Sequence, residues 1–129
     1  MPQPIIYVDR SHILPGRLDE LKAQMRELAA FVEANEPQLL AYQMHLSEDG
    51  RQMSVIHVHA DRASLEAHLV IAGPAFAPFA ALIRLVSIDV YGSPGESAEA
   101  QLREKAAMLG GGRVLVHPFQ AGFARLGAA

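Results

Sequence analysis

The sequence contains no cysteine, no tryptophan and no run of basic residues. The lack of cysteine excludes disulfides, thiolate nucleophiles and Cys-ligated zinc or iron–sulfur centres. A net charge of −3 without clustered lysine or arginine argues against nucleic-acid binding, which needs a basic surface. No stretch approaches the roughly 18 apolar residues of a membrane span, and the N-terminus lacks a signal-peptide pattern. We therefore expect a cytoplasmic protein that binds neither nucleic acid nor membrane.

The 129 residues, half of them hydrophobic, predict one domain with its own core. Residues 4–13 are β-rich and predict a first strand. Apolar side chains at three- and four-residue steps then predict an amphipathic helix, which should end before Pro37 because the residue preceding a proline disfavours the helical conformation. These side chains are Leu18, Leu21, Met25, Leu28 and Val32.

Residues 38–47 and 52–60 predict two strands joined by a hairpin. Asp49-Gly50 between them is typical of a two-residue type I′ turn, which needs positive φ at both positions. Such a turn places His45 on the sheet face opposite to Tyr42. A loop one residue longer or shorter would instead place His45 on the same face as His57 and His59. The predicted cross-strand pairs are Leu46 with Met53, Met44 with Val55, Tyr42 with His57 and Leu40 with His59.

The second half of the chain completes the predicted sheet. Asp61 is the expected cap of a second helix, which Gly73-Pro74 interrupts before a short helical piece and a strand at 83–91. The order β-α-β-β-α-β predicts an α+β, ferredoxin-like antiparallel sheet with helices on one face, formed by residues 1–92.

Residues 93–129 form a predicted C-terminal extension. Ser93, Pro94 and Glu96 suggest the cap, first position and capping glutamate of a helix that ends before Gly110. A short strand at 113–119 follows, and residues 120–129 carry no assignment. The extension is too small to fold alone, so it should pack on the core or reach a partner subunit.

Apolar residues occur at both the odd and the even positions of the strands, so both faces of the sheet carry apolar side chains that need to be covered. A partner subunit's sheet is the economical cover and predicts a homodimer with an interface of roughly 1,600 Å² or more. One apolar set is Ile6, Val8, Val86, Ile88 and Val90; the other is Ile5, Tyr7, Ile83 and Leu85.

Residues 4–92 resemble the dimeric α+β barrel proteins, specifically the antibiotic-biosynthesis-monooxygenase-like group. The resemblance rests on four stretches taken together: "PGRLDELK", "ANEPQLLAYQ", "HADRASLEAHL" and "GPAFAPF". It implies a homodimer whose two four-stranded sheets form a barrel, with a ligand pocket between each sheet and its own helices. Some members oxygenate phenolic or quinone-like substrates without metal or flavin, because the deprotonated substrate reacts with oxygen itself.

The chain departs from this family in several positions. It lacks the tryptophan that catalytic members often place in the pocket, and its only asparagine, Asn35, ends the first helix. The Asn-Trp-His set of the haem-degrading branch is therefore missing. His57 and His59 stand where relatives often carry a glutamate and a large aromatic residue, and His68 alone matches a position where the family frequently has histidine.

The resemblance makes the histidines candidates for acid–base chemistry. His57 and His68 are the predicted catalytic residues, since a neutral imidazole can remove a phenolic proton, and Tyr42 would orient the ligand. The alternative is structural, with each imidazole satisfied by a backbone carbonyl, a hydroxyl or Glu66. The predicted ligand-binding residues are His59, Met44, Phe76 and Phe79.

A metal site at the histidines is a further alternative. His57 and His59 lie on one strand face, about 7 Å apart at their backbones, but a stable site normally needs a third protein ligand. We predict no metal or cofactor. The predicted function is a cofactor-independent monooxygenase-like protein that acts on a small aromatic or quinone-like ligand. A non-catalytic ligand-binding or stress-related barrel and a His-based metal-binding protein are the alternatives.

Overall fold

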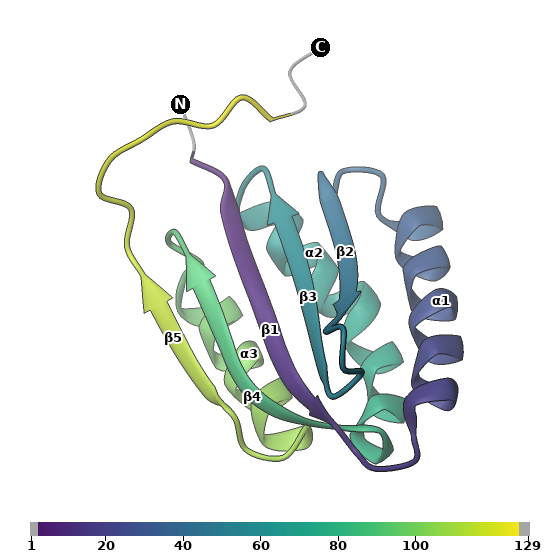
Figure 1. The fold of residues 1–129 in the computed structure, drawn as a ribbon. Helices are drawn as coiled ribbons and strands as arrows, with labels where there is room; N and C mark the ends of the chain where they lie inside the picture. The colour runs from purple at the N-terminus through teal and green to yellow at the C-terminus, as the bar shows by residue number, and fades with distance from the viewer. Residues whose placement is uncertain (1–2, 127–129) are drawn as a thin grey trace.

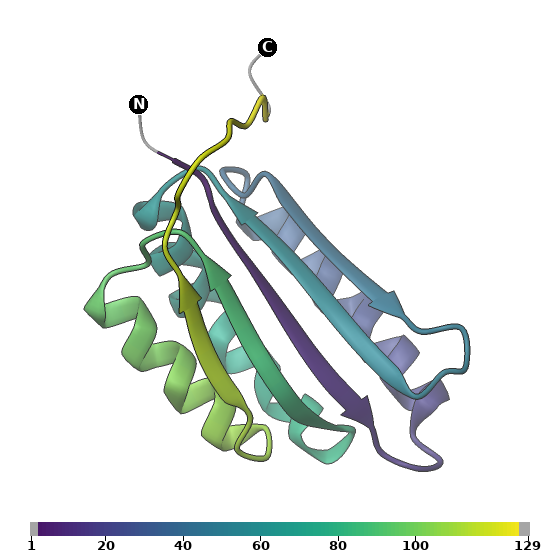
Figure 2. The same cartoon turned by 60° about the vertical axis from the view of Figure 1, so that its left-hand side comes forward.

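The computed structural model describes residues 3–126 and shows one mixed sheet with helices on one face. The strand order is β2-β3-β1-β4-β5, antiparallel throughout except for the parallel pair β4–β5 (Figure 1). Figure 2 shows the helices behind the twisted sheet. The elements are β1 (Ile5–Ile13), α1 (Leu18–Asn35), β2 (Ala41–Leu46), β3 (Gln52–His59), α2 (Arg62–Ala72), the 3₁₀ helix η1 (Gly73–Ala81), β4 (Ile83–Tyr91), α3 (Glu96–Met108) and β5 (Arg113–His117).

The β-α-β-β-α-β order of the ferredoxin-like core is confirmed. Helix α1 buries the predicted apolar face and ends at Asn35, before Pro37. The Asp61 side chain caps α2 by accepting a hydrogen bond from the Ser64 backbone N–H at 2.9 Å. The predicted interruption at Gly73 is a change from α-helix to the 3₁₀ helix η1, which carries the chain to β4.

The β2–β3 hairpin has the predicted register. Leu46 lies opposite Met53 and Tyr42 lies opposite His57. Tyr42 therefore faces the helices, whereas the exposed His45 lies on the other face of the sheet.

The predicted type I′ turn is wrong, because the hairpin loop has four residues. The Ser47 N–H donates to the Gln52 carbonyl at 2.9 Å, and the Gly50 N–H donates back to the Ser47 carbonyl at 3.0 Å. Gly50 has a φ of 70°, but Asp49 does not adopt positive φ. The Asp49 carboxylate instead accepts hydrogen bonds from the Ser47 hydroxyl and the Arg51 N–H, which stabilises this wider turn.

A β-bulge changes which side chains of β4 face the helices. The β1–β4 register shifts once, leaving Val86 without a partner in β1. Beyond the bulge, Ile88 and Val90 are fully buried on the same face as Leu85, whereas Val86 is exposed. The prediction that Val86, Ile88 and Val90 share one face is therefore wrong, since the extra residue reverses the alternation of the strand.

The C-terminal extension adds to the same layers. Strand β5 joins the sheet edge beside β4, and α3 packs against α2 and β4. The predicted cap at Ser93 is wrong, because α3 begins at Glu96 after Gly95, whose φ is 88° and which offers no side chain. Pro94 thus lies in the irregular segment before the helix, and the Ser93 carbonyl accepts a hydrogen bond from Arg62 Nε at 2.8 Å.

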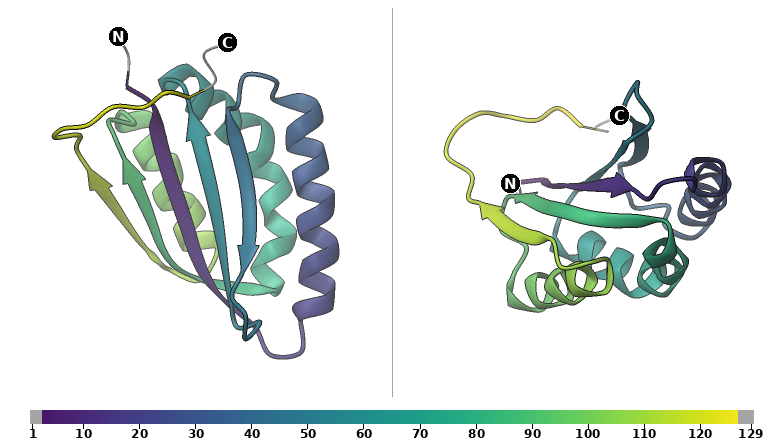
Figure 3. Two further views of the ribbon diagram at one scale, coloured as in Figure 1. Left: turned by 45° about the horizontal axis from the view of Figure 1, so that its top comes forward. Right: turned by 60° about the horizontal axis from the view of Figure 1, so that its bottom comes forward.

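The core lies between the sheet and the helices. Within residues 3–126, no helix covers the opposite sheet face, where Ile6, Val8, Ile56 and Val58 are partly buried. Figure 3 shows the C-terminal tail arching over this side; residues 127–129 of the tail, and residues 1–2, lie outside the described part of the chain. The predicted homodimer would cover this face, and that expectation stays a prediction.

Helices α2 and η1 together form one segment long and apolar enough to cross a membrane. This segment, Arg62–Ala81, has a mean hydropathy of 1.2. Leu65, Ala72 and Phe79 within it are fully buried. Val70 in the same segment is exposed, so the segment lies only partly in the core.

Candidate active site

Three histidines from two elements, strand β3 and helix α2, meet in the core. The alternation of β3 turns His57 and His59 toward the helices, and α2 brings His68 over them. Each of the three histidine residues is at most 1% exposed. The ring centroid of His68 lies 5.1 Å from that of His57 and 5.4 Å from that of His59.

His57 and His59 are each held through Nδ1. His57 Nδ1 lies 3.1 Å from the Tyr7 carbonyl, which can only accept, so the neutral ring carries its proton on Nδ1 and has a bare Nε2. His59 Nδ1 lies 2.7 Å from the Ser64 hydroxyl. Burial lowers the pKa of His57 well below 6.5 and that of His59 to about 4. Both rings are therefore neutral at physiological pH.

His68 and Glu36 form a buried dyad. His68 Nδ1 lies 2.8 and 2.9 Å from the two carboxyl oxygens of Glu36, and both side chains are essentially inaccessible. Burial raises the pKa of Glu36 to about 7, whereas burial and the charge of Lys105 lower the pKa of His68 to about 3. When Glu36 is ionised, the Nδ1–H of neutral His68 donates to it and Nε2 presents a free lone pair. The dyad thus fixes an unprotonated ring nitrogen at a defined position.

Two tyrosines complete this polar cluster. The Tyr7 ring stacks on His57 with centroids 3.6 Å apart, and Tyr42 approaches His57 edge-on at 5.0 Å. Burial raises the pKa of both phenols, so both stay neutral donors. Within the described chain, neither hydroxyl has a hydrogen-bond partner, and neither does Nε2 of any of the three histidines. Five buried polar atoms therefore have unused hydrogen-bonding capacity.

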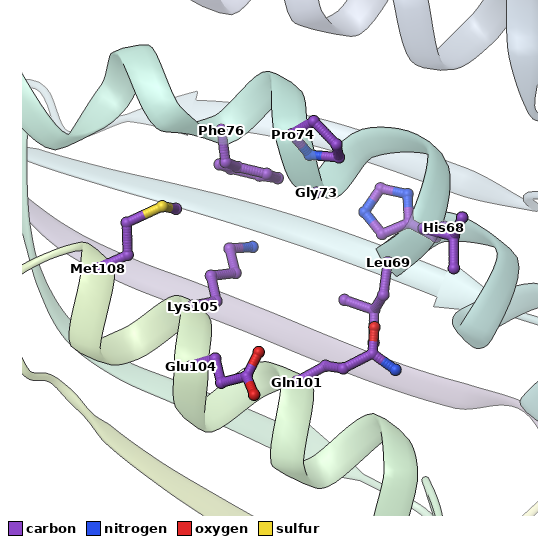
Figure 4. Close-up of a pocket in the computed structure, with 10 residues that line it drawn as sticks. His68, Leu69, Gly73, Pro74, Phe76, Gln101, Glu104, Lys105 and Met108 are labelled. Carbon is purple, nitrogen blue, oxygen red and sulfur yellow. The ribbon is translucent and has the colours of Figure 1, made fainter.

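A cavity of about 330 Å³ opens beside this cluster, between α2, η1 and α3. Figure 4 shows the His68 imidazole, the Phe76 ring and the Lys105 side chain directed into this space. Of the three clustered histidines, His68 is the one that lines the cavity. The lining residues are His68, Leu69, Val70, Gly73, Pro74, Phe76, Gln101, Glu104, Lys105 and Met108.

Lys105 brings a buried cation to the cavity wall. Its Nζ donates to Asp9 Oδ2 at 2.7 Å and lies 3.7 Å from the centroid of the Phe76 ring. Only 7% of the Lys105 side chain is exposed. The ion pair ties α3 to β1, and it places a positive charge close to the neutral histidines.

The structure brings some of the predicted site residues together and places others away from the cavity. His57, His59, His68 and Tyr42 form one cluster. Phe76 lines the cavity, and Phe79 is buried behind it with ring centroids 5.6 Å apart. Met44 packs against the core from β2 and does not line the cavity.

Sequence reasoning missed four polar groups of this site. The carboxylate beside His68 is Glu36 and not Glu66, which is exposed. The Glu36-Pro37 pair was one available signal, because it marks the helix end that faces the sheet. No local signal indicated Tyr7 or the Asp9–Lys105 pair, whose members are 96 residues apart.

The described residues contain no ligand set for the alternative of a metal site. No group of three histidine, aspartate or glutamate side chains within residues 3–126 is arranged to hold a metal ion. The Nδ1 atoms of the three histidines are instead engaged by protein oxygens.

The fold is similar to several solved structures. MupZ from Pseudomonas fluorescens superposes with a TM-score of 0.73 at 20% identity, covering 95% of both chains. SnoaB from Streptomyces nogalater, a cofactor-independent oxygenase, gives a TM-score of 0.59 at 18% identity over 73% of this chain and 96% of its own. A protein from Chloroflexus aurantiacus, provisionally assigned as an antibiotic biosynthesis monooxygenase, gives 0.58 at 20% identity over 73% and 96%.

These likenesses establish the fold. The chain has the architecture of the antibiotic-biosynthesis-monooxygenase-like α+β barrel proteins, and the likeness to MupZ extends into the C-terminal extension. No protein-family model and no curated protein matches the sequence. Identity near 20% carries no residue role from those proteins to this one.

Proposed function

We propose that this chain, which has the antibiotic-biosynthesis-monooxygenase-like fold, is a cofactor-independent oxygenase of small phenolic or quinone-like compounds. His68 Nε2 accepts the substrate proton, and the ionised Glu36 carboxylate at Nδ1 stabilises the imidazolium that forms. The supporting observation is the dyad, in which Glu36 holds Nδ1 of His68 while Nε2 has no protein partner beside a cavity. The resulting substrate anion is electron-rich enough to reduce oxygen itself.

The other predicted residues have supporting roles in this proposal. His57 supplies a second neutral imidazole behind His68, and Tyr42 offers an unpaired hydroxyl to orient the ligand. Phe76 forms part of the apolar wall, Phe79 packs behind it, and His59 lies beside His68, whereas Met44 has no place in the cavity wall. The cavity is at the lower end of the ligand-pocket range of about 300–1,000 Å³, which favours a compact substrate.

Oxygen consumption with a panel of hydroxyquinones and phenols tests this function. His68→Gln should lower kcat/KM for the active substrate by about 10²- to 10⁴-fold, the usual contribution of a positioned base. Glu36→Gln should also lower it, because a neutral amide does not favour the required tautomer of His68. His45→Gln is the matched control, since His45 is exposed on the other sheet face. Full turnover in His68→Gln would refute the assignment.

The alternative function is a non-catalytic ligand-binding barrel. Ligand-dependent thermal stabilisation without oxygen uptake, across the whole panel, would support that alternative and contradict oxygenation. Stoichiometric metal in the purified protein would instead support the metal alternative.

We also propose that the protein acts in the cytoplasm as a homodimer. The partly buried apolar side chains Ile6, Val8 and Ile56 on the sheet face without helices support this association. Light scattering at micromolar concentration should give twice the chain mass of 14.0 kDa. A monomer under these conditions would contradict the proposed dimer and leave the catalytic proposal testable on its own.

A further inference from the structure

The chain has two lysines, and they have opposite environments. Lys22 lies exposed on α1, whereas Lys105 is buried on α3 and lines the cavity. Burying an ammonium group carries a large desolvation cost unless partners compensate it. The partners of Lys105 therefore indicate what else this cation can bind.

The protein's own groups do not saturate Lys105. Within residues 3–126, its Nζ makes one hydrogen bond, to Asp9 Oδ2, although an ammonium has three N–H donors. The face of Phe76 lies 3.7 Å from the charge, at cation–π distance, and offers no hydrogen-bond acceptor of the ordinary kind. The second carboxyl oxygen of Asp9 has no partner either. This ion pair is under-satisfied on both sides.

The cavity wall combines the charge of Lys105 with polar and apolar side chains. Gln101 and His68 are polar members of the wall, and His68 Nε2 is a buried atom without a partner in the described chain. Leu69, Phe76 and Met108 form the apolar part of the wall. An aromatic ring would pack against these side chains while an attached anionic oxygen reached the ammonium.

We propose that this cavity is a binding site for compact aromatic oxyanions, with the anionic oxygen paired to Lys105 Nζ. The occupant is a one- or two-ring compound that carries a carboxylate or an ionised hydroxyl. This inference rests on the proposed function only for the natural ligand, because that reaction would create such an anion beside Lys105. Binding itself requires no turnover.

Asp9 does not prevent a second anion from binding. Its hydrogen bond uses one of the three N–H donors of Lys105, so two donors remain for a second anion. Burial raises the pKa of Asp9 even though Lys105 opposes the shift. The exposed Glu104 lies at the cavity wall as a like charge that weakens binding. Glu104→Gln should therefore tighten anion binding modestly.

Calorimetry with 1-naphthoate and its uncharged analogue 1-naphthamide tests the site. The wild type should bind naphthoate about 10- to 100-fold more tightly than naphthamide, as expected for a charge-assisted hydrogen bond. Lys105→Met should remove this preference, and Lys105→Arg should keep part of it. Lys22→Met is the matched control and should bind as the wild type does. Equal affinity for the two compounds in the wild type would overturn the proposal.

A second measurement covers the case in which Lys105→Met does not fold. In wild-type protein labelled with ¹³Cε-lysine, the two lysine signals are resolved by comparison with Lys22→Met. Naphthoate should shift the Lys105 signal and leave the Lys22 signal in place; no shift at saturation refutes the site.

Naphthoate binding and oxygen uptake by the wild type, measured separately, distinguish this inference from the oxygenase proposal. Naphthoate binding by a wild type that consumes no oxygen would refute the oxygenase alone, whereas oxygen uptake without anion preference would refute the Lys105 site alone.

Discussion

Lowering the pH from 8 to 5 should destabilise the fold through the three buried histidines. The folded-state pKa of His68 is about 3 and that of His59 about 4, and that of His57 is well below its ordinary 6.5. A histidine with a lowered folded pKa contributes stability that is present above pH 6.5 and is lost as the pH falls toward the folded value. At pH 5, His59 and His68 each account for a loss of about 2 kcal/mol, from roughly 1.5 pKa units at 1.36 kcal/mol, and His57 acts in the same direction.

Glu36 opposes this trend. Its pKa rises from 4.5 to about 7 on folding, so its contribution is favourable at low pH and is lost as the pH rises through 7. Between pH 8 and 5 it restores roughly 2–3 kcal/mol against the ~4 kcal/mol lost through His59 and His68. A net loss of at least about 1–2 kcal/mol remains, to which His57 adds, and this is a measurable part of a typical stability of 5–15 kcal/mol.

Urea unfolding followed by circular dichroism at pH 8, 7, 6 and 5 measures this loss. His59→Asn should reduce the slope of unfolding free energy against pH by about one proton, or ~1.4 kcal/mol per pH unit between pH 4.5 and 6. His45→Asn, at an exposed position, should leave the slope unchanged. The reasoning fails if unfolding free energy is flat over this range, or if the buried imidazoles titrate near 6.5 by NMR.

Two further predictions concern catalysis and packing. For the oxygenase proposal, kcat/KM should rise with pH through about 7 as Glu36 ionises and frees His68 Nε2; Glu36→Gln should abolish this limb of the pH–rate profile, and an unaltered limb would contradict the dyad's role. A Cβ at Gly112 would lie 2.8 Å from the Leu85 carbonyl oxygen, so Gly112→Ala should lower the thermal midpoint. Gly111→Ala meets no atom within 4 Å and should lose only about 1 kcal/mol through its φ of 87°, and an equal effect of the two substitutions would refute the clash.

Local patterns were sufficient for the elements that depend on nearest neighbours in sequence. The apolar spacing in α1 and the proline after it define that helix, and Asp61 defines the start of α2. The hairpin register was predicted correctly, although the predicted type of turn was wrong. A four-residue loop keeps the same cross-strand pairs as a two-residue loop, because it adds one residue to each side.

The site depended on contacts that no local pattern contains. The histidines were recognisable as candidates from their sequence positions, and the resemblance singled out His68. Its partner Glu36 comes from the end of α1, which the path of the chain over the sheet brings beside α2. The bulge at Val86 is likewise visible only once β1 and β4 are paired, since alternation in β4 alone suggests the opposite faces.

The sequence by itself determined the order of the elements, the ferredoxin-like fold and the stretch that carries His57, His59 and His68. These follow from hydrophobic periodicity, turn residues and caps, which act within a few positions along the chain. Tertiary structure alone decided which atoms of those histidines stay free and which charge lies beside them. Lys105 and Asp9 are 96 residues apart, and burial gives their pairing its strength because water no longer screens it.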